Sequence, residues 1–174
     1  MNRYFRWSGG EGALVGAEVA KTRTRGGGGT YSRVVSGVSG RVLVVDDNRV
    51  IRQLIRVNLE LEGFEVATAT DGAECLEVVH RFRPDLVTLD VVMPRLDGLR
   101  TAALLRTDAR TRHLPIAIIS ACDEGEVASG LEVGVDAFLA KPFEPADLVQ
   151  LVRGLLLPPV DDRRGTGRAG RTQG

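Results

Sequence analysis

Between residues 41 and 157, short apolar runs alternate with stretches in which apolar residues recur at helical spacing. A continuous apolar run predicts a buried strand, because a parallel strand covered on both faces needs no polar side. Five such runs stand at residues 42–45, 66–69, 86–89, 116–119 and 137–140.

A helix is predicted after each strand. Ile51, Leu54 and Ile55 share one face of the first helix, which Gly63 ends. Asp71 and Glu74 form a capping box at the start of the second, which Cys75, Val79 and Phe82 line. The other three are expected at 99–107, at 124–133, and around Leu148, Leu151, Val152, Leu155 and Leu156. Five strand–helix units predict an α/β fold with one doubly wound, five-stranded parallel sheet.

Composition divides the chain into three parts. Overall, 23 Lys and Arg balance 23 Asp and Glu over 174 residues. Residues 1–40 carry six basic and two acidic residues, residues 41–157 carry 13 and 19, and residues 158–174 carry four and two. The first 40 residues also hold ten of the 21 glycines. We therefore expect a globular domain at 41–157, a Gly-rich basic disordered extension before it and a disordered tail after it.

Several classes of protein are disfavoured. Two cysteines do not make a disulfide scaffold. No apolar stretch approaches the ~20 residues of a membrane helix, and Glu11 and Glu18 interrupt any apolar core of a signal peptide. We expect a cytoplasmic protein without a membrane partner. The basic residues of the first 40 lack a clustered motif, so direct DNA binding is not expected.

Polar residues follow the predicted strands. Asp46 and Asp47 come after the first strand, Asp90 after the third, Ser120 after the fourth and Lys141 after the fifth. In a doubly wound sheet, ligands bind outside the carboxyl ends of the strands. Converging carboxylates repel one another unless a cation lies between them. A hard divalent ion, Mg²⁺, suits such a set of oxygen ligands.

These residues lie in four motifs: VVDDN at 44–48, DLVTLDVVMPRLDG at 85–98, IISA at 118–121 and GVDAFLAKPF at 134–143. In this order and spacing they resemble the receiver domain of two-component response regulators. The resemblance covers residues 41 to about 157 and implies a flavodoxin-like sheet of order 2-1-3-4-5. Since only 17 residues follow Leu157, a stand-alone receiver is expected rather than a DNA-binding regulator.

The resemblance also implies a role for each site residue. Asp90 matches the phosphoacceptor. Asp46, Asp47, Asp90 and the backbone carbonyl of Val92 match the ligands of Mg²⁺. Lys141 matches the lysine that pairs with the acyl phosphate. The resemblance also implies a cis peptide bond between Lys141 and Pro142. Ser120 matches the switch hydroxyl and Phe138 the switch aromatic, although Phe138 also fits a plain core position and Ser120 an ordinary strand end.

The expected function is a phosphorylation-dependent switch. A histidine kinase or phosphotransfer protein would phosphorylate Asp90, and a downstream protein would read the face formed by the fourth helix, fifth strand and fifth helix. We do not expect an enzyme that turns over small phosphoesters. A haloacid-dehalogenase-type phosphatase needs a second Asp two residues after its nucleophile, and Val92 stands at that position here. The alternative is an unphosphorylated pseudo-receiver that acts as a protein-binding adaptor.

Overall fold

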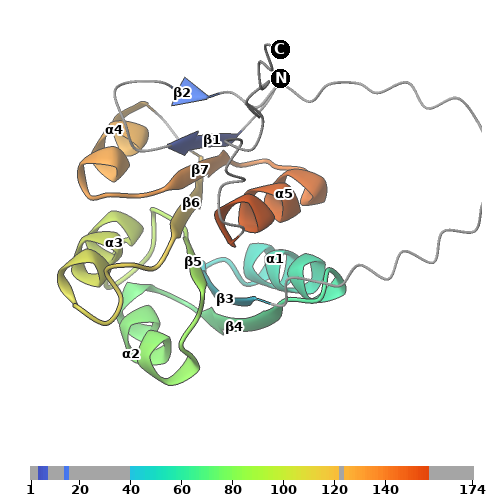
Figure 1. The fold of residues 1–174 in the computed structure, drawn as a ribbon, viewed down its shortest axis with the longest axis horizontal. Coiled ribbons are helices and arrows are strands. Elements are labelled where there is room, and N and C mark those ends of the chain that lie inside the picture. The colour runs from blue at the N-terminus through green and yellow to red at the C-terminus, as the bar shows by residue number, and fades with distance from the viewer. Residues whose placement is uncertain (1–3, 8–13, 16–39, 122–123, 157–174) are drawn as a thin grey trace, which may run out of the picture.

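The computed structural model describes residues 4–7, 14–15, 40–121 and 124–156. Helices cover both faces of one central sheet (Figure 1). The strands are β1 (Tyr4–Trp7), β2 (Leu14–Val15), β3 (Arg41–Val45), β4 (Glu65–Ala69), β5 (Leu86–Leu89), β6 (Ile116–Ser120) and β7 (Ala137–Ala140). The helices are α1 (Arg49–Leu61), α2 (Gly72–Phe82), α3 (Gly98–Thr107), α4 (Glu124–Glu132) and α5 (Pro145–Leu156).

The five predicted strands form the parallel part of the sheet. Their spatial order is β7-β6-β5-β3-β4, which is the expected 2-1-3-4-5 order read from the other edge. The strand order reverses between β3 and β5, which pair in parallel with Val45 opposite Leu89. The carboxyl ends of these two strands therefore meet at the point where a doubly wound fold binds its ligands.

Two apolar cores lie on the two faces of the sheet. On one face, Leu43, Val45, Val87 and Leu89 pack with residues of α2, α3 and α4. On the other, Val42, Val44 and Ala117 pack with residues of α1 and α5. Alternate residues of one strand serve opposite cores because successive side chains point to opposite faces. This two-sided burial is why the central strands read as unbroken apolar runs.

The N-terminal segment departs from the prediction. Residues 1–40 were expected to form no regular structure, yet β1 and β2 lie within them and extend the sheet beyond β7. Both pairings are antiparallel, β1 with β7 and β1 with β2. Strands of four and two residues are too short for a recognisable period, and β1 finds its partner far along the chain. Residues 1–3, 8–13 and 16–39 of the predicted extension and the predicted tail at 158–174 lie outside the described residues.

Helix α1 also differs in detail. Ile55 and Leu59 form its buried side, whereas Leu54, predicted to face inward with Ile51 and Ile55, is 42% exposed. Leu54 belongs instead to an outer apolar stripe with Val50, Val57 and Leu61, all of them exposed. In the part of the chain that the structure describes, no helix combines the length and apolar character needed to cross a membrane.

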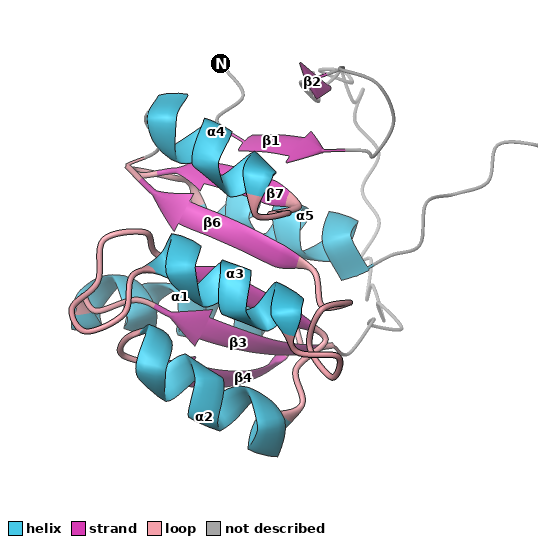
Figure 2. Ribbon diagram, turned by 90° about the vertical axis from the view of Figure 1, so that its left-hand side faces the viewer, coloured by secondary structure: helices cyan, strands magenta, loops and turns pink. Residues whose placement is uncertain are grey.

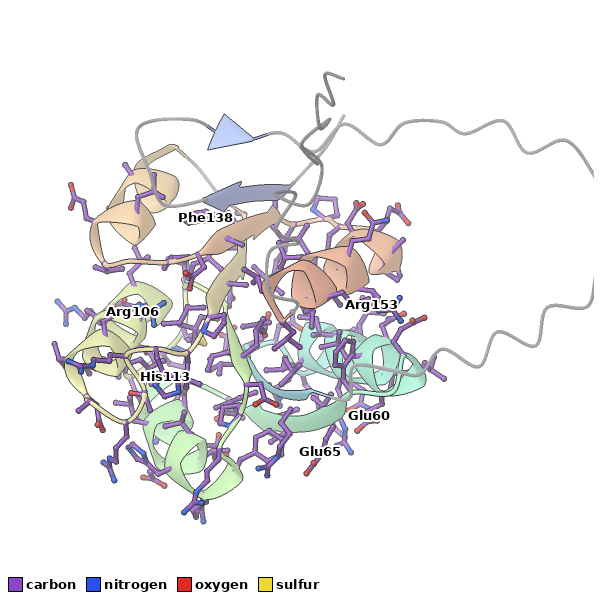
Figure 3. All side chains as sticks on the ribbon, in the orientation of Figure 1. Glu60, Glu65, Arg106, His113, Phe138 and Arg153 are labelled. Atoms are coloured by element: carbon purple, nitrogen blue, oxygen red, sulfur yellow. The ribbon has the colours of Figure 1, made fainter. Side chains whose placement is uncertain are left out.

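A charged cluster joins elements at the amino ends of β6 and β7. Arg106 of α3 donates to Asp136 Oδ2 at 2.8 Å and to the carbonyls of Leu114 and Gly134 at 2.7 and 2.9 Å. Asp136 Oδ2 also accepts from the amide of Ile116 at 2.8 Å. Arg106 and Asp136, with the backbone groups that they bond, are called the Arg106 clamp below (Figure 3 labels Arg106).

Candidate functional site

Three carboxylates converge at the carboxyl ends of β3 and β5. Asp46 and Asp47 directly follow β3, and Asp90 directly follows β5. One oxygen from each lies within 4.8 Å of the others. Asp46 and Asp90 are buried, whereas Asp47 is exposed. These three carboxylates and the ammonium of Lys141 are called the acid cluster below.

Lys141 joins the two buried carboxylates. Its Nζ donates to Asp46 Oδ2 at 2.8 Å and lies 3.3 Å from Asp90 Oδ1. Asp90 Oδ1 also accepts from the amide of Val91 at 2.9 Å. A backbone hydrogen bond fixes the position of Lys141: its amide donates to the Ser120 carbonyl at 2.7 Å. Lys141 is the residue that follows Ala140, the last β7 residue paired with β6. The ion pair therefore ties the loop after β7 to the ends of β3 and β5.

The acid cluster holds more negative than positive charge, and its ionisation reflects this. Burial raises the pKa of Asp90, and the charge of Asp46 raises it further, while Lys141 opposes both. Burial by itself lowers the pKa of Lys141, but the hydrogen bond and charge of Asp46, with Asp90, raise it on balance. Lys141 is therefore a fixed positive charge, and Asp90 is a carboxylate that a further cation stabilises in the ionised form.

The loop that carries Asp46 and Asp47 is held from both sides. Asp46 Oδ1 accepts from the amide of Asn48 at 2.8 Å, and the Asn48 side chain caps α1 by accepting from Val50 N at 2.9 Å. Arg52, one turn into α1, donates to the carbonyls of Asp46 and Asp47 at 2.6 and 3.3 Å. Capping of α1 and orientation of the acidic pair thus depend on the same few residues.

The loop after Asp90 is anchored to α2. Arg95, at a positive φ of 63°, donates through Nε to Asp71 Oδ2 at 2.6 Å and through a second nitrogen to the same oxygen. Asp71 is buried and caps α2 by accepting from Ala73 N and Glu74 N. Although burial raises the pKa of Asp71, the amide of Glu74 and the Arg95 guanidinium lower it on balance.

Ser120 and Phe138 lie where the sequence placed them. Ser120 is the last residue of β6 and is 2% exposed. Phe138, in the middle of β7 (Figure 3), is 3% exposed, and its ring lies against α4. A Cβ on Gly130 would stand 2.6 Å from Phe138 Cζ, so a glycine is what lets α4 approach the ring. The bond between Lys141 and Pro142 is cis, as expected.

The donor set fits a hard divalent cation. Each of the three residues offers a carboxylate oxygen as its ligand atom, and oxygen ligands suit Mg²⁺ rather than a thiophilic metal. Val92, whose carbonyl was predicted as a further ligand, lies two residues after Asp90 and is exposed. The side chain of valine has no ligand atom, so only the backbone carbonyl of Val92 could take that role.

Comparison with known proteins places these residues in a family. Residues 42–153 match the family described as the response regulator receiver domain. The chain belongs to this family. Its receiver domain is 44% identical over 117 residues to the response regulator MprA of Mycobacterium leprae, covering 67% of this chain and 50% of that protein. The chain spans about half the length of the curated relatives it matches.

Solved receiver domains share its fold. The chemotaxis response regulator CheY4 of Vibrio cholerae is 32% identical, with a TM-score of 0.65 over 68% of this chain and 99% of that one. The receiver domain of the sensor histidine kinase PA1611 of Pseudomonas aeruginosa is 28% identical, with a TM-score of 0.63 over 68% and 98%. That structure holds a magnesium ion in its active-site cleft. A receiver domain is a phosphoaccepting signalling domain, and in this chain the acid cluster lies at the carboxyl ends of β3 and β5.

Three positioning residues were missed from the sequence. Asn48 carried a usable signal, since Asn before an apolar-periodic stretch marks a helix N-cap. Arg52 and Arg95 carried none, because this arginine-rich sequence has many similar candidates and their bonds go to groups that only the folded chain brings near.

Proposed function

We propose that this protein is a phosphorylation-dependent switch that accepts a phosphoryl group on Asp90 from the phosphohistidine of a histidine kinase or phosphotransfer protein. The observation that carries the proposal is the excess charge of the acid cluster. Three carboxylates lie within 4.8 Å of one another, and Lys141 supplies one positive charge. A cluster that lacks a cation in this way suits binding of Mg²⁺ and a phosphoryl group.

The chain's own residues have defined parts in the transfer. Oδ1 of Asp90 accepts from Val91 N and lies beside Lys141, which fixes the carboxylate so that Oδ2 is the nucleophile. A bond forms between Oδ2 and phosphorus as the phosphorus–nitrogen bond to the donor imidazole breaks. Asp46, Asp47, Asp90 and the Val92 carbonyl would hold Mg²⁺, which offsets charge on the transferring group. Lys141 then pairs with the acyl phosphate.

The switch follows from where the phosphoryl group would lie. It adds negative charge and acceptor oxygens next to Lys141 and at the end of β6, where the Ser120 hydroxyl bonds to it. Movement of Ser120 leaves room for Phe138, and the face of α4, β7 and α5 is biased toward a second arrangement that a downstream protein reads. The protein passes on a signal and is not a turnover enzyme.

The outer stripe of α1 suits the phosphodonor. Val50, Leu54, Val57 and Leu61 are exposed on the helix that begins two residues after Asp47. A donor protein has to bring its phosphohistidine to Asp90, and therefore contacts the surface around the acid cluster. An exposed apolar stripe at that place offers the burial that such a contact needs.

The proposal is tested by phosphorylation with acetyl phosphate and Mg²⁺, followed by intact mass measurement. Wild type is expected to gain one phosphoryl group, and Asp90→Asn none. Asp108→Asn is the matched control, because Asp108 is a partly exposed carboxylate that follows α3, pairs with Arg110 and lies outside the acid cluster, and it should label as wild type does. Labelling should also disappear in EDTA. Wild type that is not labelled by acetyl phosphate or by any kinase would favour the pseudo-receiver adaptor.

A further inference from the structure

The outer edge of β7 is occupied by the chain's own N-terminal segment. Strand β1 pairs with β7 in antiparallel register, with Tyr4 opposite Leu139, Phe5 opposite Phe138 and Arg6 opposite Ala137. On its other side, β1 pairs with β2. The backbone of Phe138, the switch aromatic of the proposed function, is therefore paired on both sides, with β6 and with β1.

This pairing covers the face that a downstream partner is proposed to read. Strand β1 lies along β7, between α4 on one side and α5 on the other (Figure 1). The view at right angles shows the same order, with β1 continuing the sheet past β7 beside α4 (Figure 2). A partner that approached β7 from its open edge would meet β1 first.

The two edges of the parallel sheet differ in a way that explains the cover. The edge strand β4 begins with the exposed charge of Glu65, and its middle residues are only half-buried. Strand β7 reads Ala-Phe-Leu-Ala and carries no charged residue. An uncharged apolar edge strand with unpaired amides and carbonyls is a template for any extended peptide. Of the two edges, β7 is the one that needs a resident strand.

We propose that β1 (Tyr4–Trp7), paired on its outer side with β2 (Leu14–Val15), forms an intramolecular strand addition that occupies the β7 edge and withholds it from an extended peptide segment of a partner protein. Peptides add to free sheet edges through main-chain hydrogen bonds. Because β1 belongs to the same chain, it competes at a high effective concentration. That the competitor is the downstream protein, reading the face of α4, β7 and α5, rests on the proposed function. The occupation of the β7 edge by β1 does not depend on phosphorylation.

A pair of double variants tests the occupation in the unphosphorylated full chain. Phe5→Pro with Arg6→Pro removes two successive amide donors, and since successive donors of a strand point to opposite sides, one of them is a donor toward β7. Phe5→Val with Arg6→Thr keeps both donors and favours a strand, so it is the matched control. Trp7 of β1 is the chain's one tryptophan, which makes its fluorescence anisotropy a direct measure of strand docking.

The proline variant is expected to lower the anisotropy of Trp7 and to speed hydrogen exchange of those amides at 137–139 that point toward β1 by about tenfold or more, while the β7 amides that point toward β6 change less. The control variant should match wild type in both measurements. Equal anisotropy and equal exchange in wild type and proline variant would overturn the proposal.

Binding of a peptide in trans tests the competition. The probe is a labelled synthetic peptide with the sequence of residues 1–16, titrated against each full-length protein. The proline variant should bind it at least about tenfold more tightly than wild type or the control variant, because its edge is free. Equal affinity for all three proteins would overturn the competition. Labelling of Asp90 by acetyl phosphate in the proline variant tests the proposed function separately, so failure of one does not imply failure of the other.

Discussion

The acid cluster and the Arg106 clamp are both charged and half-buried, and they stand at opposite ends of the parallel strands. In the clamp, one guanidinium meets one carboxylate, and its other donors go to the carbonyls of Arg112, Leu114 and Gly134. In the acid cluster, three carboxylates share the single ammonium of Lys141. The clamp is balanced in charge, and the cluster is not.

This difference separates structural from functional polar groups. A buried charge that is paired and hydrogen-bonded holds elements together, and losing its partner is costly. A set of like charges with too few partners opposes folding, so the chain keeps it only where a ligand completes it. The contrast makes opposite predictions for the two ends of the sheet.

The largest effect is expected from Arg106→Met. The substitution removes the Arg106 donors from three carbonyls and leaves Asp136 with the Ile116 amide but without its cation, and we expect it to reduce the free energy of unfolding by about 3 kcal/mol. Urea denaturation measures the change. Arg100→Met is the control on the same helix, because the Arg100 side chain is 80% exposed, and it should stay within about 0.5 kcal/mol of wild type. Similar losses in the two variants would mean that the clamp is no stronger than a surface pair.

Matched Asp→Asn substitutions should change stability in opposite directions. Asp136→Asn weakens the bonds from Arg106 and Ile116 and should cost about 1 to 2 kcal/mol. Asp90→Asn, measured without Mg²⁺, removes a like charge from the acid cluster and should stabilise the protein by about 1 kcal/mol. A loss in both variants would show that Asp90 is no less satisfied than Asp136.

The pH dependence of the Asp90→Asn gain follows from the direction of the shift. The folded-state pKa of Asp90 is raised above its ordinary value of 3.8, so its ionisation costs stability at neutral pH. The gain should therefore be full above the raised folded pKa and should disappear as the pH falls below 3.8, where the carboxyl is protonated in both states. Urea denaturation of wild type and variant across this range measures it, and a gain that persists in acid would contradict this cause.

How far the sequence predicted each region depends on the range of the contacts. The acid cluster was predictable because Asp46, Asp90 and Lys141 each follow a readable strand, and parallel topology brings strand ends together. Arg106 lies on a helix with Arg100 and carries no mark that distinguishes it. Its role depends on the loops before β6 and β7, whose carbonyls come near it only in the folded chain.

The edges of the sheet were the least predictable part. Strand β1 owes its place to pairing with β7 and not to a pattern of its own. Leu54 was placed inward because an apolar residue at helical spacing reads as core, and period alone does not distinguish a buried stripe from an exposed one. Both errors concern surfaces that a partner strand or a partner protein would cover.

Magnesium should stabilise the acid cluster and leave the clamp unaffected. At a free concentration ten times its dissociation constant, a ligand of the folded state adds about 1.4 kcal/mol. Wild type and Asp136→Asn should both gain this amount when denaturation is repeated in Mg²⁺, and Asp90→Asn and Asp47→Asn should gain less. An equal gain in all four proteins would place the bound ion away from the acid cluster.

The smallest effect concerns Thr88, a polar residue that belongs to neither kind of cluster. Thr88 lies on β5 two residues before Asp90, and its buried hydroxyl has no hydrogen-bond partner among the described residues. Thr101 is equally buried, but its hydroxyl donates to the Asp97 carbonyl at 2.6 Å. Valine keeps the shape of threonine and removes the hydroxyl, so Thr88→Val should stabilise the protein by about 0.5 to 1 kcal/mol and Thr101→Val should destabilise it by a similar amount. Urea denaturation of the two variants checks the signs. A loss in Thr88→Val as large as that in Thr101→Val would mean that the β5 hydroxyl is satisfied in solution, unlike the carboxylate of Asp90 in the acid cluster two residues further on.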